Sequence, residues 1–110
     1  MMNKEYYRPL PDSVTIDVNE ELTKSTGRRQ LGLYATQTIL RNTILGITHV
    51  FDDREEDGMY RTPLGGFFNH SETPNCKIIR FDGYYHLCTL EDILIDDELT
   101  CKYKTYDPTK

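Results

Sequence analysis

The chain has 110 residues, 37% of them hydrophobic, and a formal net charge of −5 from 18 acidic and 13 basic residues. This length suits one domain, and the acidic balance argues against direct nucleic-acid binding, for which a basic face is expected. No apolar run approaches the roughly 20 residues that cross a bilayer, and the polar N-terminus has no signal-peptide core. We therefore expect a protein that binds no membrane and is cytoplasmic.

The cysteine count argues against a disulfide framework. Cys76, Cys88 and Cys101 are odd in number and form no CxxC pair, so reduced thiols are the simplest interpretation. Their spacing, with or without a histidine, matches no common zinc signature. We expect buried cysteines that act as small hydrophobic residues, and no metal.

The first half of the chain predicts an arm followed by strands. Residues 1–13 are polar and contain two prolines, which favour extended backbone. Residues 14–18 alternate apolar and polar side chains, as a half-buried strand does. The polar stretch 19–30 is turn-like, and residues 31–36 are again strand-like.

The stretch from residue 37 to residue 51 is rich in β-branched side chains. Its apolar spacing could fit a helix, but β-branched residues favour strands. We predict a short strand to Ile39, a turn at 40–42 and a longer strand at 43–51.

The second half predicts a hairpin and a final strand. Asp82-Gly83 separates the apolar runs 77–81 and 84–90, which is a strong hairpin signal, and 98–103 is a further strand. No segment of ten or more residues has clean helical periodicity. The fold class is therefore mainly β, with little helix, in a single domain over residues 14–110.

The segment GGFFNHSETPNC, residues 65–76, has two interpretations. Ser71, Pro74 and Asn75 suit an ordinary turn, in which Asn69 and His70 would only satisfy local backbone groups. Alternatively, the glycines allow close approach, and the aromatic pair beside Asn-His resembles the lining of a small-molecule site.

Two acidic stretches, 52–57 and 91–98, each contain five carboxylates. They are either solvated turns or a field that attracts a cationic Lys- or Arg-rich segment.

Three segments, taken in order, resemble the motifs of the SET-domain protein lysine methyltransferases. They are Gln30-Leu31-Gly32-Leu33-Tyr34-Ala35, then Gly66-Phe67-Phe68-Asn69-His70-Ser71-Glu72-Thr73-Pro74-Asn75, and last Glu98-Leu99-Thr100-Cys101-Lys102-Tyr103. The resemblance covers residues 14–106, and the chain is similar to the small stand-alone bacterial and viral members, which lack pre-SET and post-SET segments. If the protein is viral, the resemblance implies a location inside the host cell.

The resemblance implies a SET-domain fold: several short sheets of β-clip type, with the last two motifs joined in a C-terminal pseudoknot. It also implies transfer of a methyl group from S-adenosylmethionine to a lysine of a basic protein segment, with S-adenosylhomocysteine as product and no metal. Tyr103 would be the catalytic residue. The cofactor-binding residues would be Arg29, Gln30, Leu31, Asn69, His70 and, over the adenine ring, Tyr106.

Two alternatives stay open. Gln30 and Gly66 stand where the family has glycine and arginine, and no cysteine-rich post-SET segment follows Tyr103, so a non-catalytic SET-like binding module is the second hypothesis. A homodimer, in which a partner completes the site, is the third.

Overall fold

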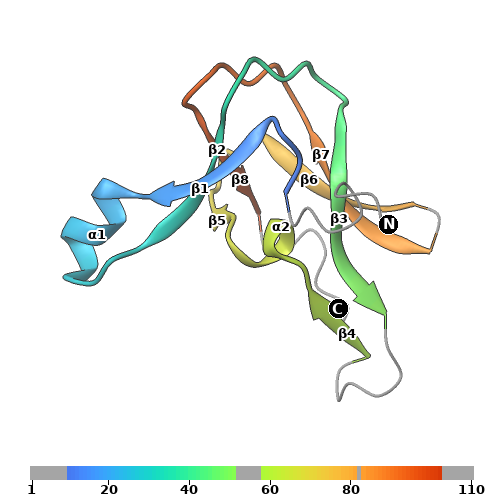
Figure 1. Cartoon of the computed structure of the whole chain (residues 1–110), viewed down its shortest axis with the longest axis horizontal. Helices are drawn as coiled ribbons and strands as arrows, with labels where there is room; N and C mark the ends of the chain where they lie inside the picture. Colours follow the sequence, from blue (N-terminus) through green and yellow to red (C-terminus); the bar gives the residue numbers. More distant parts are fainter. Residues whose placement is uncertain (1–9, 52–57, 82, 103–110) are drawn as a thin grey trace, which may run out of the picture.

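A computed structural model describes residues 10–51, 58–81 and 83–102 as two four-stranded sheets and two short helices (Figure 1). The first sheet has the order β1 (Val14–Val18), β2 (Leu31–Ala35), β8 (Glu98–Cys101) and β5 (Asn69–His70), and the second has the order β4 (Met59–Arg61), β3 (Ile44–Phe51), β7 (Tyr84–Thr89) and β6 (Cys76–Phe81). The helices are α1 (Glu20–Thr26) and α2 (Pro63–Gly66). Within these ranges, neither helix has the length and apolar character needed to cross a membrane.

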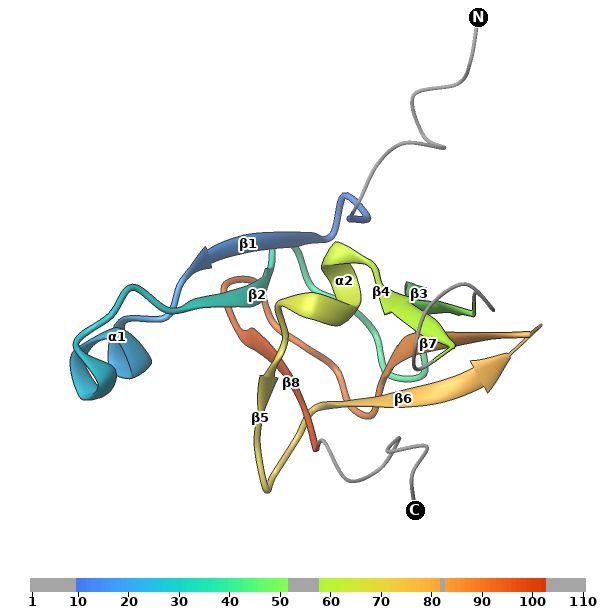
Figure 2. The same ribbon diagram turned by 90° about the horizontal axis from the view of Figure 1, so that it is seen from below.

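Strand β8 lies in the middle of the first sheet although it comes last in the described sequence. It pairs antiparallel with β2 and parallel with β5, with Leu33 opposite Leu99 and Asn69 opposite Thr100. Figure 2 shows β5 and β8 side by side. The second and third motifs therefore lie next to each other, as expected for the last two motifs of a SET fold.

The second sheet contains the predicted hairpin. Strands β6 and β7 pair from Cys76 opposite Thr89 to Phe81 opposite Tyr84, which leaves a two-residue connection. Gly83 has a φ of 81°, the left-handed conformation that such a turn requires. The Asp-Gly signal was therefore correct. The predicted long strand is also confirmed, as β3.

The loops 36–43 and 90–97 are related by an approximate twofold symmetry. Ile39 and Ile93 exchange backbone hydrogen bonds of 2.8 Å in both directions. Asn42 N–H donates to the Thr89 carbonyl at 3.0 Å, and Asp96 N–H donates to the Ala35 carbonyl at 2.8 Å. The predicted strand ending at Ile39 is thus a single bridge, and its partner is the equivalent position of the other loop.

The core lies between the two sheets and receives residues from both. Leu33 and Leu99 from the first sheet and Leu87 from the second are fully buried. Ile39 and Ile93 close one end of this core, and Leu64 of α2 joins it.

Helix α1 was not predicted, and the turn assigned to residues 19–30 is wrong there. The Asn19 side chain caps the helix by accepting from Leu22 N, and Gly27 ends it at a φ of 71°. None of its residues is buried, so the apolar periodicity that predicts a helix is missing and the capping residues define it. Figures 1 and 2 show α1 projecting from the end of the β1–β2 hairpin.

Helix α2 packs against β3 by close backbone contact. The hydroxyl of Thr62 accepts from Gly65 N at 3.3 Å and donates to the Ile47 carbonyl at 2.6 Å. A Cβ on Gly65 would collide with the backbone of Thr48, whereas a Cβ on Gly66 would meet nothing within 4 Å. Gly65 is therefore required for protein packing, and Gly66 leaves open space.

Candidate functional site

The first sheet brings the three motif segments together. The first motif forms β2, the second includes β5, and the third forms β8 between them. Tyr34 lies opposite Glu98 in the β2–β8 register, and His70 lies opposite Cys101 in the β5–β8 register. Strand β8 thus brings three segments that lie far apart in the sequence into one sheet.

The side chain of Asn69 connects all three segments. Its Nδ2 donates to the carbonyl oxygen of Leu31 at 3.0 Å and to Oε2 of Glu98 at 2.7 Å. These two acceptors use both amide hydrogens. The Oδ1 atom of Asn69 is then the part of this amide that can accept from a ligand. Leu31 and Asn69, both predicted site residues, are in direct contact.

Glu98 is the site residue that sequence reasoning missed. Its Oε1 accepts from Asn19 Nδ2 at 2.9 Å, while its Oε2 accepts from Asn69. A Cβ on Gly32 would collide with this carboxylate and lie 3.0 Å from Asn69 Nδ2, so the glycine of the first motif makes room for it. The signal in the sequence was the glutamate that begins the third motif.

The charge of Glu98 also acts on Tyr34. Burial, and then the negative charges of Glu98 and Asp17, raise the pKa of the Tyr34 hydroxyl. This phenol therefore stays protonated at neutral pH. It can donate a hydrogen bond, and the Val18 carbonyl lies 3.4 Å away.

The backbone of His70 faces away from β8. Ser71 N–H donates to the Cys101 carbonyl at 2.9 Å, and successive peptide groups along a strand point in opposite directions. The N–H and C=O of His70 therefore point to the other side of β5. Among the described strands, β5 is the outermost of its sheet, so these two groups lie on the side of β5 away from β8.

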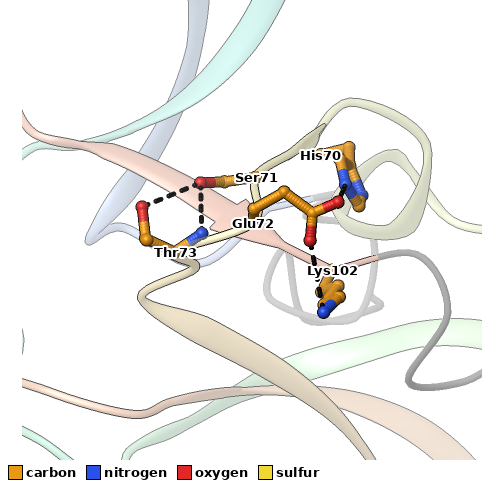
Figure 3. A network of polar contacts seen from close by, with 5 residues as sticks. All are labelled: His70, Ser71, Glu72, Thr73 and Lys102. Carbon is orange, nitrogen blue, oxygen red and sulfur yellow. Dashed lines mark hydrogen bonds and ion pairs between the residues drawn. The ribbon is translucent and has the colours of Figure 1, made fainter.

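The His70 side chain belongs to a surface network (Figure 3). Glu72 accepts from Lys102 Nζ at 3.2 Å and lies 3.4 Å from His70 Nε2. The hydrogen bonds from Lys102 and then His70 lower the pKa of the Glu72 carboxyl. This network ties the turn after β5 to the end of β8 at the surface. An ion pair this exposed adds little stability.

Asn75 holds the backbone of β8 from the other end of the motif. Its Nδ2 donates to the Glu98 carbonyl at 2.8 Å, and its Oδ1 accepts from Thr100 N at 2.9 Å. The turn interpretation of Ser71 and Asn75 was thus correct in part. Thr73 N–H does donate to Ser71 Oγ at 3.0 Å, but Asn75 joins this turn to the third motif.

The remaining predicted site residues differ in their surroundings. Arg29 is exposed. The Gln30 carbonyl accepts from Asn19 N at 2.7 Å, and Gln30 N–H donates to the Thr23 hydroxyl at 3.0 Å. Both backbone groups of Gln30 therefore support α1. Tyr103 and Tyr106, like the acidic stretch 52–57, lie outside the described residues.

The second acidic stretch is largely a structural turn. Asp92 Oδ1 accepts from Arg41 N at 2.8 Å, and Asp97 Oδ2 accepts from Leu94 N at 3.3 Å. With Glu98 held by two asparagines, three of the five carboxylates have partners within the fold. Glu91 and Asp96 are exposed and contribute negative charge at the surface.

The three cysteines are buried free thiols, as predicted. Desolvation raises the pKa of Cys101 to about 12 and raises that of Cys76 further, so both stay protonated at neutral pH. In the part of the chain that the structure describes, no three His, Cys, Asp or Glu side chains are grouped as metal ligands would be.

Comparison with known proteins decides the family. Residues 47–104 match the SET domain family. The chain belongs to the SET-domain family. It is 37% identical over 101 residues to a histone-lysine N-methyltransferase, H3 lysine-4 specific, of Emericella nidulans, and 35% identical over 99 residues to the protein of the same name from Aspergillus oryzae. These alignments cover 83% and 81% of this chain but only 8% of each relative.

Solved structures agree on the fold. The methyltransferase domain of human PR domain-containing protein 2 matches with a TM-score of 0.65 at 17% identity, covering 90% of this chain and 82% of that one. This likeness confirms the predicted SET-domain fold. The resemblance to small bacterial and viral members, and the domain limits 1–13 and 14–110, stay predictions.

Proposed function

We propose that this SET domain is an S-adenosylmethionine-dependent protein-lysine N-methyltransferase. One observation carries the proposal: β8 brings the three motif segments together around the Asn69–Glu98 contact. The curated relatives bear names with the same activity. The chain spans only 8% of those relatives, so activity and substrate are inferred for this domain alone.

The residues at the edge of β5 fit the cofactor. S-adenosylmethionine carries an adenine with hydrogen-bond donors and acceptors side by side, a cationic amine and a sulfonium methyl. Asn69 offers an acceptor in Oδ1 because its Nδ2 hydrogens bind Leu31 and Glu98, and His70 is the next residue of the same motif. The Leu31 carbonyl accepts a hydrogen bond from the Asn69 amide. Arg29 and Tyr106 stay candidates for the cofactor site because of their positions beside the motifs.

When bound, the cofactor supplies an electrophilic methyl group for direct displacement by an amine. The protein's task is then alignment. The hydroxyl of Tyr103, in the third motif just after β8, would orient the substrate amine and accept a hydrogen bond from it. A desolvated surrounding lowers the pKa of a lysine amine and so favours the neutral, nucleophilic form.

A basic protein segment is the substrate we infer. The names of the fungal relatives specify lysine 4 of histone H3, so an H3 tail is the first sequence to test. The negative charge of this chain and the exposed Glu91 and Asp96 support attraction of a Lys- or Arg-rich segment. We infer action inside the cell, where such segments and the cofactor are both available.

The test is methyl transfer from radiolabelled S-adenosylmethionine to histone H3 and to a panel of other basic proteins, with mass spectrometry to locate the methyl group. We expect label on lysine, and we expect Tyr103→Phe to lower the rate at least about 100-fold, as loss of a positioned polar group does. Tyr84→Phe, at the exposed start of β7, is the matched control and should retain the rate. Equal transfer by Tyr103→Phe and wild type would contradict the assigned mechanism.

A non-catalytic SET-like binding module is the alternative. The observation in its favour is that both backbone groups of Gln30 bind within the fold instead of facing a cofactor. Calorimetry with S-adenosylhomocysteine separates the two: no heat of binding at millimolar concentration would favour the module. A homodimer that completes the site is compatible with either function, and light scattering of the active protein tests it.

A further inference from the structure

The carboxylate of Glu98 is held between two asparagine side chains from different parts of the chain. Oε1 accepts from Asn19 Nδ2 at 2.9 Å, and Oε2 accepts from Asn69 Nδ2 at 2.7 Å. Both partners are donors, so the position between them needs two acceptors. A carboxylate provides two, whereas an amide provides one acceptor and one donor.

Each asparagine is also fixed by a second contact. Asn19 Oδ1 accepts from Leu22 N at 2.9 Å and so caps α1. Asn69 Nδ2 also donates to the Leu31 carbonyl at 3.0 Å. Neither amide can rotate by 180° without losing one of these bonds. Each amide is therefore oriented by two contacts together, one to the backbone and one to the Glu98 carboxylate.

We propose that Glu98 is a positioning residue that couples the cap of α1 to the cofactor-binding edge of β5. It does so by fixing Asn69 so that Oδ1 is presented to the ligand, and by holding Asn19 at the start of α1. The inference rests on the proposed function for the identity of the ligand. It assigns α1, which buries none of its residues, a role in cofactor affinity.

The surroundings of Glu98 agree with a role beyond packing. Gly32 is needed where any side chain would displace the carboxylate, and Asn75 fixes the backbone of the same residue through the Glu98 carbonyl. Both the main chain and the side chain of Glu98 are thus held. Such support is what keeps a binding group in one geometry.

A reversal of polarity tests the coupling. In Glu98→Gln, the nitrogen of the new amide faces the side-chain nitrogen of either Asn19 or Asn69, so that two donors meet. In Asn19→Asp, two carboxylates face each other while the helix cap is kept. The double variant Asn19→Asp/Glu98→Gln restores a donor opposite an acceptor at both contacts. Glu91→Gln, an exposed change of the same chemistry in the same acidic stretch, is the control.

The measurements are calorimetry with S-adenosylhomocysteine and amide hydrogen exchange across α1. We expect each single variant to weaken binding on the order of tenfold, since two donors or two carboxylates facing each other in a half-buried site cost about that much. We expect the double variant to bind within about threefold of wild type, because the pair is non-additive. Protection of the α1 amides from hydrogen exchange should fall in each single variant and recover in the double variant.

Two outcomes would overturn the inference. One is a Glu98→Gln protein that is folded and binds as tightly as wild type. The other is a double variant that binds no better than the weaker single variant. If wild type itself fails to bind, the proposed function is wrong, and exchange in α1 alone decides the coupling: protection lost in Glu98→Gln and regained in the double variant supports it, and unchanged protection refutes it.

Discussion

Asn42 and Asp96 occupy equivalent places in two loops that bind each other. Their φ angles are 63° and 72°, and they are the two non-glycine residues with positive φ in the described part of the chain. Each donates its N–H to the end of the strand that precedes the other's loop, Asn42 to Thr89 and Asp96 to Ala35. The turn that each forms therefore supports the other.

This equivalence predicts equal responses to substitution. Asn42→Ala and Asp96→Ala should each lower the free energy of unfolding by about 1 kcal/mol, because a Cβ in the left-handed region without a local polar side chain is unfavourable. Asn42→Gly and Asp96→Gly should be at least as stable as wild type. Urea unfolding measures all four, and alanine variants as stable as the glycine variants would contradict the prediction.

Asn75 should contribute more to stability than its place in a turn suggests. Asn75→Ala removes two hydrogen bonds of 2.8 and 2.9 Å to the backbone of β8 and leaves half-buried groups unpaired. We expect a loss of roughly 2–4 kcal/mol. Thr73→Ala, an exposed change in the same turn, should cost less than about 0.5 kcal/mol. Thermal or urea unfolding measures the stability of the two variants. Equal stability would contradict the prediction.

Gly65 and Gly66 form a matched pair in one helix. Gly65→Ala would force a Cβ into the backbone of Thr48, whereas Gly66→Ala meets nothing within 4 Å. We expect Gly65→Ala to destabilise by about 1–3 kcal/mol, as overpacking does, and Gly66→Ala to be neutral or slightly stabilising. Similar melting temperatures for the two variants would show that α2 does not pack on β3 in this way.

The buried thiols predict a loss of stability in alkali. Burial raises the pKa of Cys101 from 9.0 to about 12, so the unfolded chain releases this proton first as the pH rises. The contribution of this thiol to stability should therefore be constant below pH 9 and fall between pH 9 and 12, at up to about 1.4 kcal/mol per pH unit for each such thiol.

Urea unfolding from pH 7 to pH 11 checks the alkaline slope. Cys101→Ala should lower stability below pH 9 and reduce the slope above pH 9. A slope unchanged by this substitution would assign the effect to other groups. As a second measure, the folded protein should react slowly with a thiol reagent at pH 7 and quickly in urea.

The sequence predicted those parts of the fold that local chemistry determines. The Asp82-Gly83 pair predicted the β6–β7 hairpin, and the alternation of apolar and polar residues identified β1. Helix α1 was missed because its signal is in Asn19 and Gly27 and not in an apolar stripe. The symmetric contact of Ile39 with Ile93 depends on two loops that no local pattern connects.

The site shows the same difference between what local motifs predict and what contacts between distant segments determine. Asn69 and Leu31 could be named from motifs, and the fold places them in contact. Glu98 could not be assigned a role, because its partners Asn19 and Asn69 come from opposite halves of the chain. Only the pairing of β8 with both β2 and β5 makes that contact, and a pairing of distant strands is a property of the whole fold.

The central position of β8 has a consequence for how the protein is made. Strands β2 and β5 each keep an unpaired edge until residues 98–101 have left the ribosome and inserted between them. Contacts between such distant segments form slowly, and unpaired edges invite wrong partners in the meantime. A nascent chain that has reached β7 can close the β6–β7 hairpin but has no site, so the ability to bind a ligand should arise in a single late step of folding.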